Sequence, residues 1–227
     1  MNSIADRLAA VRSRIEAACL ACGRSPSEIS LLAVSKTFPA QAVEQALQAG
    51  QLAFGENYIQ EAIEKMATLR HWPLQWHCIG PMQSNKTRLV AENFDWAHTV
   101  DRLKIAQRLS EQRPSNLPPL QVCVQVNIDG GPNKSGVSPE ELMPLARAIV
   151  GMPGLRLRGL MCIPEPAPDF ESARQVFERA SALFRTSQHE GLALDTLSMG
   201  MSDDLEAAIA AGSTMVRVGS AIFGSRT

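Results

Sequence analysis

Short apolar segments of strand-like composition alternate with helix-like segments along this chain, and the alternation occurs eight times. In the clearest case, residues 120–127 are rich in valine and other apolar side chains and end in Asn127, as expected of a strand covered by helices on both faces. The strand-like segments are residues 31–37, 52–55, 75–80, 94–99, 120–127, 155–161, 195–197 and 215–218. Eight such strands in 227 residues predict one TIM-like (β/α)8 barrel domain over residues 1–227.

The helix-like segments lie between these strands, and one extra helix precedes the first strand. Residues 2–21 carry apolar side chains at helical spacing, and Gly23 follows as a C-terminal stop. Ser84 and Asp101 are expected to cap two later helices. Four of the remaining predicted helices have both bounds: residues 42–49, 101–111, 171–189 and 203–211. Three more are expected: one that ends near residue 69, one that follows Ser84 and one that begins at residue 139.

Composition excludes several classes of function. The formal net charge of −1 provides no basic field for nucleic acid, and no apolar run approaches the roughly 18 residues that a membrane span needs. We therefore expect a soluble cytoplasmic protein, and a monomer, with no nucleic-acid or membrane partner. The five cysteines are irregularly placed. The Cys19–Cys22 spacing resembles half of a metal or redox site, but no second pair lies nearby, so we expect no metal.

Lys36 is the first candidate functional residue, because it stands where the first buried strand ends. A lysine at that position is held on a rigid support while its side chain leaves the apolar layer. If its surroundings desolvate the ammonium group, the neutral nucleophilic amine becomes accessible, as lysines that form Schiff bases require. The alternative is a solvated lysine at a strand end.

A possible phosphate site follows the last two strands. The segment Ser198–Met199–Gly200 follows the seventh strand, and Gly219–Ser220 follows the eighth. Barrels of this type often bind phosphate between these two loops, where backbone N–H groups face the anion. The glycines would permit close backbone approach and the serine hydroxyls can donate hydrogen bonds. The alternative is two ordinary turns, but Lys36 at the same barrel mouth favours phosphate.

A reactive lysine opposite a phosphate site indicates an aldehyde on a phosphorylated ring, and pyridoxal 5′-phosphate (PLP) has both groups. Arg217 lies two residues before Gly219 and is placed to meet the pyridine nitrogen. An arginine there disfavours protonation of the ring and weakens it as an electron sink. The alternative for Arg217 is a salt bridge at the strand end.

Several segments resemble those of a known family. They are LLAVSKTFP, FGENYIQE, WHCIGPMQSNK, VQVNIDGGPNKSG, LRGLMCIP and LSMGMSDDLEAAIAAGSTMVRVGSAIFGSR, which together extend from residue 31 almost to the end. On these motifs the chain resembles the pyridoxal-phosphate homeostasis proteins, which are similar to the barrel domain of alanine racemases. The resemblance implies an internal aldimine at Lys36, a ring contact from Arg217, and phosphate binding by Ser198, Gly219 and Ser220 with nearby backbone amides, among them those of Met199 and Gly200.

The roles of three further residues stay open between alternatives. We expect Asn57 to reach the barrel mouth near the ring. His77 either reaches the mouth as well or is a hydrogen-bonded core histidine. Lys134 is either a second amine that receives the aldehyde or a solvated loop lysine.

Two functions are compatible with such a site. A racemase of similar fold takes a second base from a separate C-terminal domain of a partner chain, and this chain ends at Thr227, just after the barrel. The resemblance instead implies a protein that carries and buffers PLP for vitamin B6 and amino-acid homeostasis, without strong catalytic activity. We prefer the carrier, with apo forms of PLP-dependent enzymes as recipients, and keep a racemase-like enzyme as the alternative.

Overall fold

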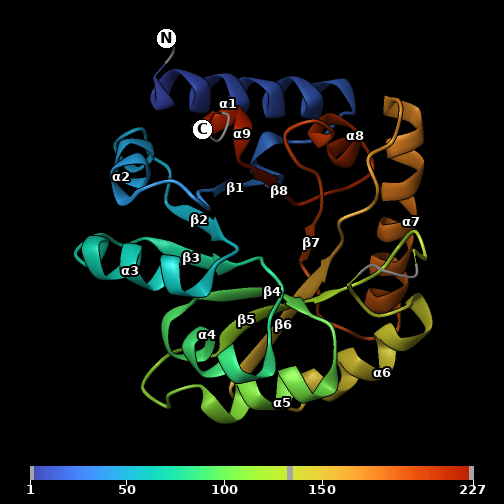
Figure 1. The fold of residues 1–227 in the computed structure, drawn as a ribbon. Coiled ribbons are helices and arrows are strands. Elements are labelled where there is room, and N and C mark those ends of the chain that lie inside the picture. Colours follow the sequence, from blue (N-terminus) through green and yellow to red (C-terminus); the bar gives the residue numbers. More distant parts are fainter. Residues whose placement is uncertain (1–2, 132–134, 225–227) are drawn as a thin grey trace.

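The computed structural model describes residues 3–131 and 135–224, and its centre is a closed barrel of parallel strands (Figure 1). Each strand pairs with the next in sequence, and β8 pairs with β1 to close the barrel. This confirms the predicted (β/α)8 architecture. The strands are β1 (Ser30–Val34), β2 (Ala53–Glu56), β3 (Gln75–Cys78), β4 (Trp96–Val100), β5 (Leu120–Gln125), β6 (Leu155–Met161), β7 (Thr196–Ser198) and β8 (Met215–Val218).

Helices cover the outside of the barrel and bury the outer face of each strand. Every residue of β4 and of β8 is buried, including the polar residues His98, Thr99 and Arg217, as expected of strands inside a closed barrel that helices cover. The helices are α1 (Ile4–Ala21), α2 (Ala40–Gln48), α3 (Ile59–Leu69), α4 (Thr87–Asn93), α5 (Leu103–Gln112), α6 (Pro139–Val150), α7 (Phe170–His189), α8 (Leu205–Ala210) and α9 (Ser220–Phe223), with 3-10 turns η1 (Pro26–Glu28) and η2 (Ser84–Lys86). None of the described helices is long and apolar enough to cross a membrane.

The predicted extra helix, α1, precedes β1 and lies across the outside of the barrel. Ser3 and Asp6 form a capping box at its start, which satisfies backbone N–H groups that have no partner within the helix. Its apolar stripe includes Leu8 and Val11, which are buried, and the helix packs against α2, α8 and α9. Figure 1 shows α1 running over the red C-terminal helices. The first helix therefore contacts the last elements of the chain.

Both expected helix caps are wrong. Ser84 begins the 3-10 turn η2 instead of capping a helix, and its carbonyl oxygen accepts a hydrogen bond from Thr87 Oγ1 at 2.9 Å. Asp101 lies one residue before the N-cap of α5, which is Arg102, and it forms an exposed ion pair with that arginine. The first strand also ends earlier than expected, at Val34, so that Lys36 belongs to the loop after β1.

Candidate functional site

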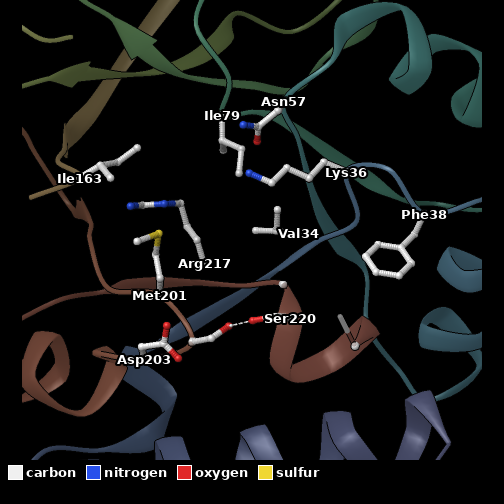
Figure 2. Close-up of a pocket in the computed structure, with 13 residues that line it drawn as sticks. Val34, Lys36, Phe38, Asn57, Ile79, Ile163, Met201, Asp203, Arg217 and Ser220 are labelled. Carbon is white, nitrogen blue, oxygen red and sulfur yellow. Dashed lines mark hydrogen bonds between the residues drawn. The ribbon is translucent and has the colours of Figure 1, made fainter. Parts of the chain in front are cut away.

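A pocket of about 260 Å³ lies at the carboxyl ends of the strands, where the sequence predicts the site (Figure 2). It brings together side chains from the loops after β1, β2, β3, β6, β7 and β8. The residues that line it are Val34, Lys36, Phe38, Asn57, Ile79, Ile163, Met201, Ser202, Asp203, Arg217, Gly219, Ser220 and Gly224. Five of the predicted site residues are among them: Lys36, Asn57, Arg217, Gly219 and Ser220.

The turn that follows β1 directs Lys36 into this pocket. The amide of Ser35 still donates to the barrel, at 3.0 Å from Gly55 O, and the amide of Phe38 closes a turn on Ser35 O at 3.1 Å. Between them, Thr37 has a φ of +67°, a conformation that costs energy for a β-branched residue. Figure 2 shows the Lys36 side chain extending past Asn57 toward the side of the pocket that Arg217 lines.

A buried polar cluster holds the Lys36 turn through contacts from α3. Lys65 Nζ, on α3, donates to Ser35 O at 2.7 Å, to Glu56 Oε1 at 2.7 Å and to Glu61 Oε1 at 2.6 Å. Glu61 Oε1 also accepts the amide of Thr37 at 2.7 Å. Ser35 Oγ donates to Glu56 Oε1 at 2.6 Å. We call Ser35, Glu56, Glu61 and Lys65 the Lys65 cluster; it fixes the strained turn that presents Lys36.

Burial dominates the electrostatics of this cluster. The Glu56 side chain is fully buried, and desolvation raises the pKa of its carboxyl group, against the hydrogen bonds from Lys65 and Ser35, which favour the charged form. The sequence analysis did not find the cluster. Glu61 and Lys65 stand at i and i+4 on α3, a spacing that is common on exposed helix faces and so gives no sign of a buried ion pair.

Arg217 brings a positive charge to the pocket. It lies on β8 and is 4% exposed; its Nη1 donates to Ser198 Oγ at 2.8 Å and its Nη2 to Cys162 O at 3.0 Å. Both acceptors, a hydroxyl group and a backbone carbonyl group, are neutral. Among the described residues Arg217 therefore does not form the strand-end salt bridge that was the alternative. Burial lowers the pKa of the guanidinium group, while nearby Cys162 and Asp204 act in the opposite direction.

Ser198 continues from Arg217 into a chain of hydrogen bonds through the barrel interior. Its Oγ lies 3.0 Å from His98 Nδ1, His98 Nε2 lies 2.9 Å from His77 Nδ1, and His77 Nε2 lies 3.0 Å from Gln75 Oε1. Arg217 can only donate and the Gln75 oxygen can only accept. The Gln75 acceptor therefore sets the direction: each histidine is neutral and donates from Nε2, and Ser198 Oγ accepts from Arg217 and donates to His98 Nδ1.

The structure decides between the two alternatives for His77. The side chain is fully buried and stacks on Trp96 with the rings 5.1 Å apart, and burial lowers its pKa to about 3. Burial also lowers the pKa of His98, and the electrostatic effects of His77 and Arg217 act in the same direction. His77 is a hydrogen-bonded core histidine and does not line the pocket, so its expected place near the ring is corrected.

The predicted phosphate segment after β7 is also corrected in part. Ser198 and Met199 are fully buried and Gly200 is buried, and none of the three lines the pocket. Gly200 has a φ of +94°, and a Cβ there would lie 2.5 Å from Ala208 Cβ, so the glycine is needed for the close approach of α8. Ser198 contributes indirectly, by accepting the Arg217 hydrogen bond.

The next residues along the chain take the place expected for that segment. Met201, Ser202 and Asp203 line the pocket, and Ser202 Oγ lies 3.2 Å from Ser220 Oγ across the gap between the two loops. Gly219 packs close to β1, since a Cβ there would lie 3.2 Å from Val34 O. A pair of hydroxyl groups thus faces the pocket on the side of α8 and α9.

Two other sequence features have no part in the pocket. Cys19 is buried and Cys22 is exposed, both are free thiols, and Cys22 Sγ donates to Cys19 O at 3.5 Å. Within residues 3–131 and 135–224, no three His, Cys, Asp or Glu side chains are grouped so that they could hold a metal ion. Lys134, the other lysine considered, lies outside the described residues.

Comparison with known proteins identifies the family. The model of the alanine racemase N-terminal domain matches residues 7–227. A pyridoxal phosphate homeostasis protein of Pseudomonas aeruginosa is 58% identical over 226 residues, which cover 100% of this chain and 97% of that protein. The Escherichia coli protein of the same name is 56% identical over 236 residues, with 100% and 98% covered. This chain belongs to the pyridoxal phosphate homeostasis protein family.

Several solved structures share the fold. PipY of Synechococcus elongatus with PLP bound is 37% identical, with a TM-score of 0.86, and the match covers 98% of this chain and 100% of PipY. PipY without PLP is 38% identical, with a TM-score of 0.87 over the same coverage. An alanine racemase of Clostridium difficile is 17% identical, with a TM-score of 0.72, and the match covers 94% of this chain and 55% of the racemase. This match shows likeness of fold alone.

Proposed function

We propose that this chain binds pyridoxal 5′-phosphate in the pocket at the barrel mouth and carries it on Lys36, as a homeostasis protein without strong catalytic activity. The observation that carries the proposal is the juxtaposition in one pocket of an amine, Lys36, a buried cation, Arg217, and the hydroxyl pair of Ser202 and Ser220. The names of the family relatives and the PLP bound in PipY support it.

The residues present fit the chemical groups of the cofactor. Its aldehyde requires an amine, and Lys36, which lines the pocket, would hold it by the Schiff-base chemistry that a lysine amine and an aldehyde supply. The ring requires apolar walls, which Val34, Ile79 and Ile163 supply. Asn57 Oδ1 is buried at the pocket with no hydrogen-bond partner among the described residues, and it offers an acceptor for a polar ring substituent.

Arg217 is suited to the pyridine nitrogen. Because the guanidinium group only donates, it favours an unprotonated ring nitrogen, which limits how far the ring can stabilise a carbanion. Ser198 and the Cys162 carbonyl group hold the guanidinium in place. This arrangement supports storage of the cofactor more than chemistry on amino acids.

The phosphate group is assigned to the opposite end of the pocket. Ser202 Oγ and Ser220 Oγ, 3.2 Å apart, can both turn their protons toward an anion, and the Gly219 backbone leaves room for it. Of the predicted phosphate ligands, Gly219 and Ser220 remain in the proposal, whereas Ser198 acts through Arg217.

A racemase-like enzyme is the second candidate. Racemisation needs a base on each face of the substrate, and the titratable side chains that line the pocket are Lys36, Asp203 and Arg217. Arg217 is held in the hydrogen-bonded chain, and Asp203 lies on the side proposed for phosphate. We therefore expect turnover of L- or D-alanine well below roughly 1 per second; a higher rate in purified protein would favour the enzyme.

The test of PLP carriage is an absorption spectrum of the purified protein with added PLP, followed by borohydride reduction and peptide mapping. We expect a Schiff-base band and one reduced adduct on Lys36. K36A should lose both, and K104A, which removes an exposed lysine of α5, should keep both. Absence of the band in the unaltered protein, or an adduct confined to other lysines, would refute the proposal.

The proposal also covers the setting of this function. We expect a cytoplasmic monomer that gives PLP to apo forms of PLP-dependent enzymes. Size-exclusion chromatography with light scattering tests the monomer. Reactivation of an apo-aminotransferase by the loaded protein, compared with the same amount of free PLP, tests the transfer.

A further inference from the structure

Arginines of α1 hold both segments that form the proposed phosphate end of the pocket. Arg7 Nε donates to Ile222 O at 2.6 Å, and its Nη2 lies 3.5 Å from Phe223 O. These carbonyl groups belong to α9, the short helix that begins with Ser220. The last carbonyl groups of a helix have no partner within it, so Arg7 supplies donors that α9 lacks.

Arg14 makes the corresponding contact with the segment after β7. Its Nη2 donates to Ser202 O at 2.9 Å, and the same guanidinium forms a forked ion pair with Glu206 on α8, with Nε–Oε1 at 2.7 Å and Nη2–Oε2 at 2.9 Å. The fork fixes the plane of the guanidinium group, because two parallel hydrogen bonds allow little rotation. The position of the Ser202 backbone therefore follows from that of α1.

These two segments depend on such outside contacts for their position. The helix α9 has four residues, which is too short to be stable by itself, and Gly224 with a φ of +95° ends it. Its apolar residues Ile222 and Phe223 are buried, but apolar packing is not directional and does not fix the helix along its axis. The hydrogen bonds from Arg7 are directional and do fix the position of α9 along its axis. They are therefore suited to setting the position of Ser220, its first residue.

We propose that Arg7 and Arg14 are positioning residues for phosphate. They set the distance between the Ser202 and Ser220 hydroxyl groups from outside the barrel, without touching the ligand. This inference rests on the proposed function, since it takes PLP as the ligand. It gives the extra helix α1 a role in the site: one rigid element holds the loops after β7 and β8 at a fixed separation.

Selectivity for the phosphate group tests the inference. Pyridoxal, which has the aldehyde and ring but no phosphate, should use Lys36, Arg217 and the other ring contacts but not the hydroxyl groups of Ser202 and Ser220. We expect R7M and R14M to weaken PLP binding by roughly tenfold or more, since displacement of a binding group by about 1 Å has effects of that size or larger. Binding of pyridoxal should change by less than about twofold.

A matched control comes from the same helix. Arg12 Nη1 donates to Ala49 O at 2.9 Å, a contact of the same chemical kind that leads to the end of α2, away from the pocket. R12M should leave the affinity for both ligands unchanged. R14K keeps the charge but loses the fork to Glu206, so its affinity for PLP should lie between those of the unaltered protein and R14M. Urea unfolding of every variant shows whether the fold is retained.

A second readout does not depend on Lys36. Inorganic phosphate should raise the unfolding temperature of the unaltered protein and of R12M, and raise it less in R7M and R14M. Equal loss of PLP and pyridoxal binding in R7M and R14M, or no loss of either, would overturn the inference while PLP carriage stands. If the unaltered protein binds PLP no better than pyridoxal, the proposed phosphate site fails, and the inference fails with it.

Discussion

Replacement of Lys65 by methionine removes the cation from the Lys65 cluster and leaves the Glu56 carboxylate without it. The side chains of Lys65 and Glu56 are 6% and 0% exposed, so solvent cannot replace the lost partner. Loss of one partner of a buried ion pair costs about 3–5 kcal/mol of folding free energy. The folded variant can avoid part of this cost if Glu56 takes up a proton. Protonation of a carboxyl group with an ordinary pKa of 4.5 costs roughly 3 kcal/mol at pH 7, and this sets the upper limit of the loss.

This limit makes the effect of K65M depend on pH. The pKa of Glu56 is already raised by burial, and without Lys65 it rises further, so the folded variant keeps a proton that the unfolded chain releases above pH 4.5. Stability from such a group is present below the unfolded pKa and is lost as the pH rises. We therefore expect K65M to lose roughly 3 kcal/mol at pH 7 but about 1 kcal/mol or less at pH 5.

The assay is urea unfolding at both pH values, followed by the fluorescence of the buried tryptophans. In thermal unfolding at pH 7, the loss corresponds to a drop of roughly 6–12 °C for a domain of this size. K104M, at an exposed position of α5, is the control and should stay within about 0.5 kcal/mol. A loss below about 1 kcal/mol at pH 7, or the same loss at pH 5, would show that the pair does not stabilise the fold in this way.

Three further predictions concern groups around the pocket. Burial lowers the pKa of His77 in the folded protein to about 3, so the folding free energy should weaken as the pH drops below 6.5, by about 2 kcal/mol from this residue at pH 5. The buried His98 should act in the same direction. A series of urea unfolding curves in which stability rises toward pH 5 would contradict this. G80A should destabilise the fold by about 1–3 kcal/mol, because the new Cβ would lie 2.2 Å from Asn57 O. G151A is the control: its Cβ would lie 3.7 Å from Ala148 O, so it should be nearly neutral in the same unfolding assay. R217M should weaken PLP binding by roughly 10- to 100-fold, measured by fluorescence titration, since it removes a charged donor; an unchanged affinity would place the ring elsewhere.

The barrel was predictable from the sequence because short, mostly apolar segments alternate with helix-like segments eight times along the chain. β5 shows this clearly: five of its six residues are buried, and the polar residues that follow mark the strand end. Lys36 and Gly219 could be placed at the mouth for the same reason, since parallel strands of a barrel all point the same way. A residue that follows the end of a strand is therefore expected at the barrel mouth.

Side-chain direction within a strand was harder to predict. His77 and Ser198 lie near the ends of β3 and β7, as a pocket residue would, but both point into the barrel. Their partners come from other strands, and His98 stands 100 residues from Ser198 in the sequence. No local pattern encodes such a pair. The Lys65 cluster was missed for the same reason, since it joins β2, α3 and the loop after β1.

The contact between α1 and α9 has a consequence for the order of folding during synthesis. Arg7 binds the carbonyl group of Ile222, 215 residues later, and β1 finds its second neighbour, β8, only when residues 215–218 have been made. Until then the apolar stripe of α1 has no partner among α8 and α9, and contacts this distant in sequence form slowly. The proposed cofactor pocket, whose lining runs from Val34 to Gly224, is thus among the last parts to be completed. We expect nascent chains that lack the final 25 or so residues to collapse without acquiring affinity for PLP, which makes PLP a probe of finished molecules.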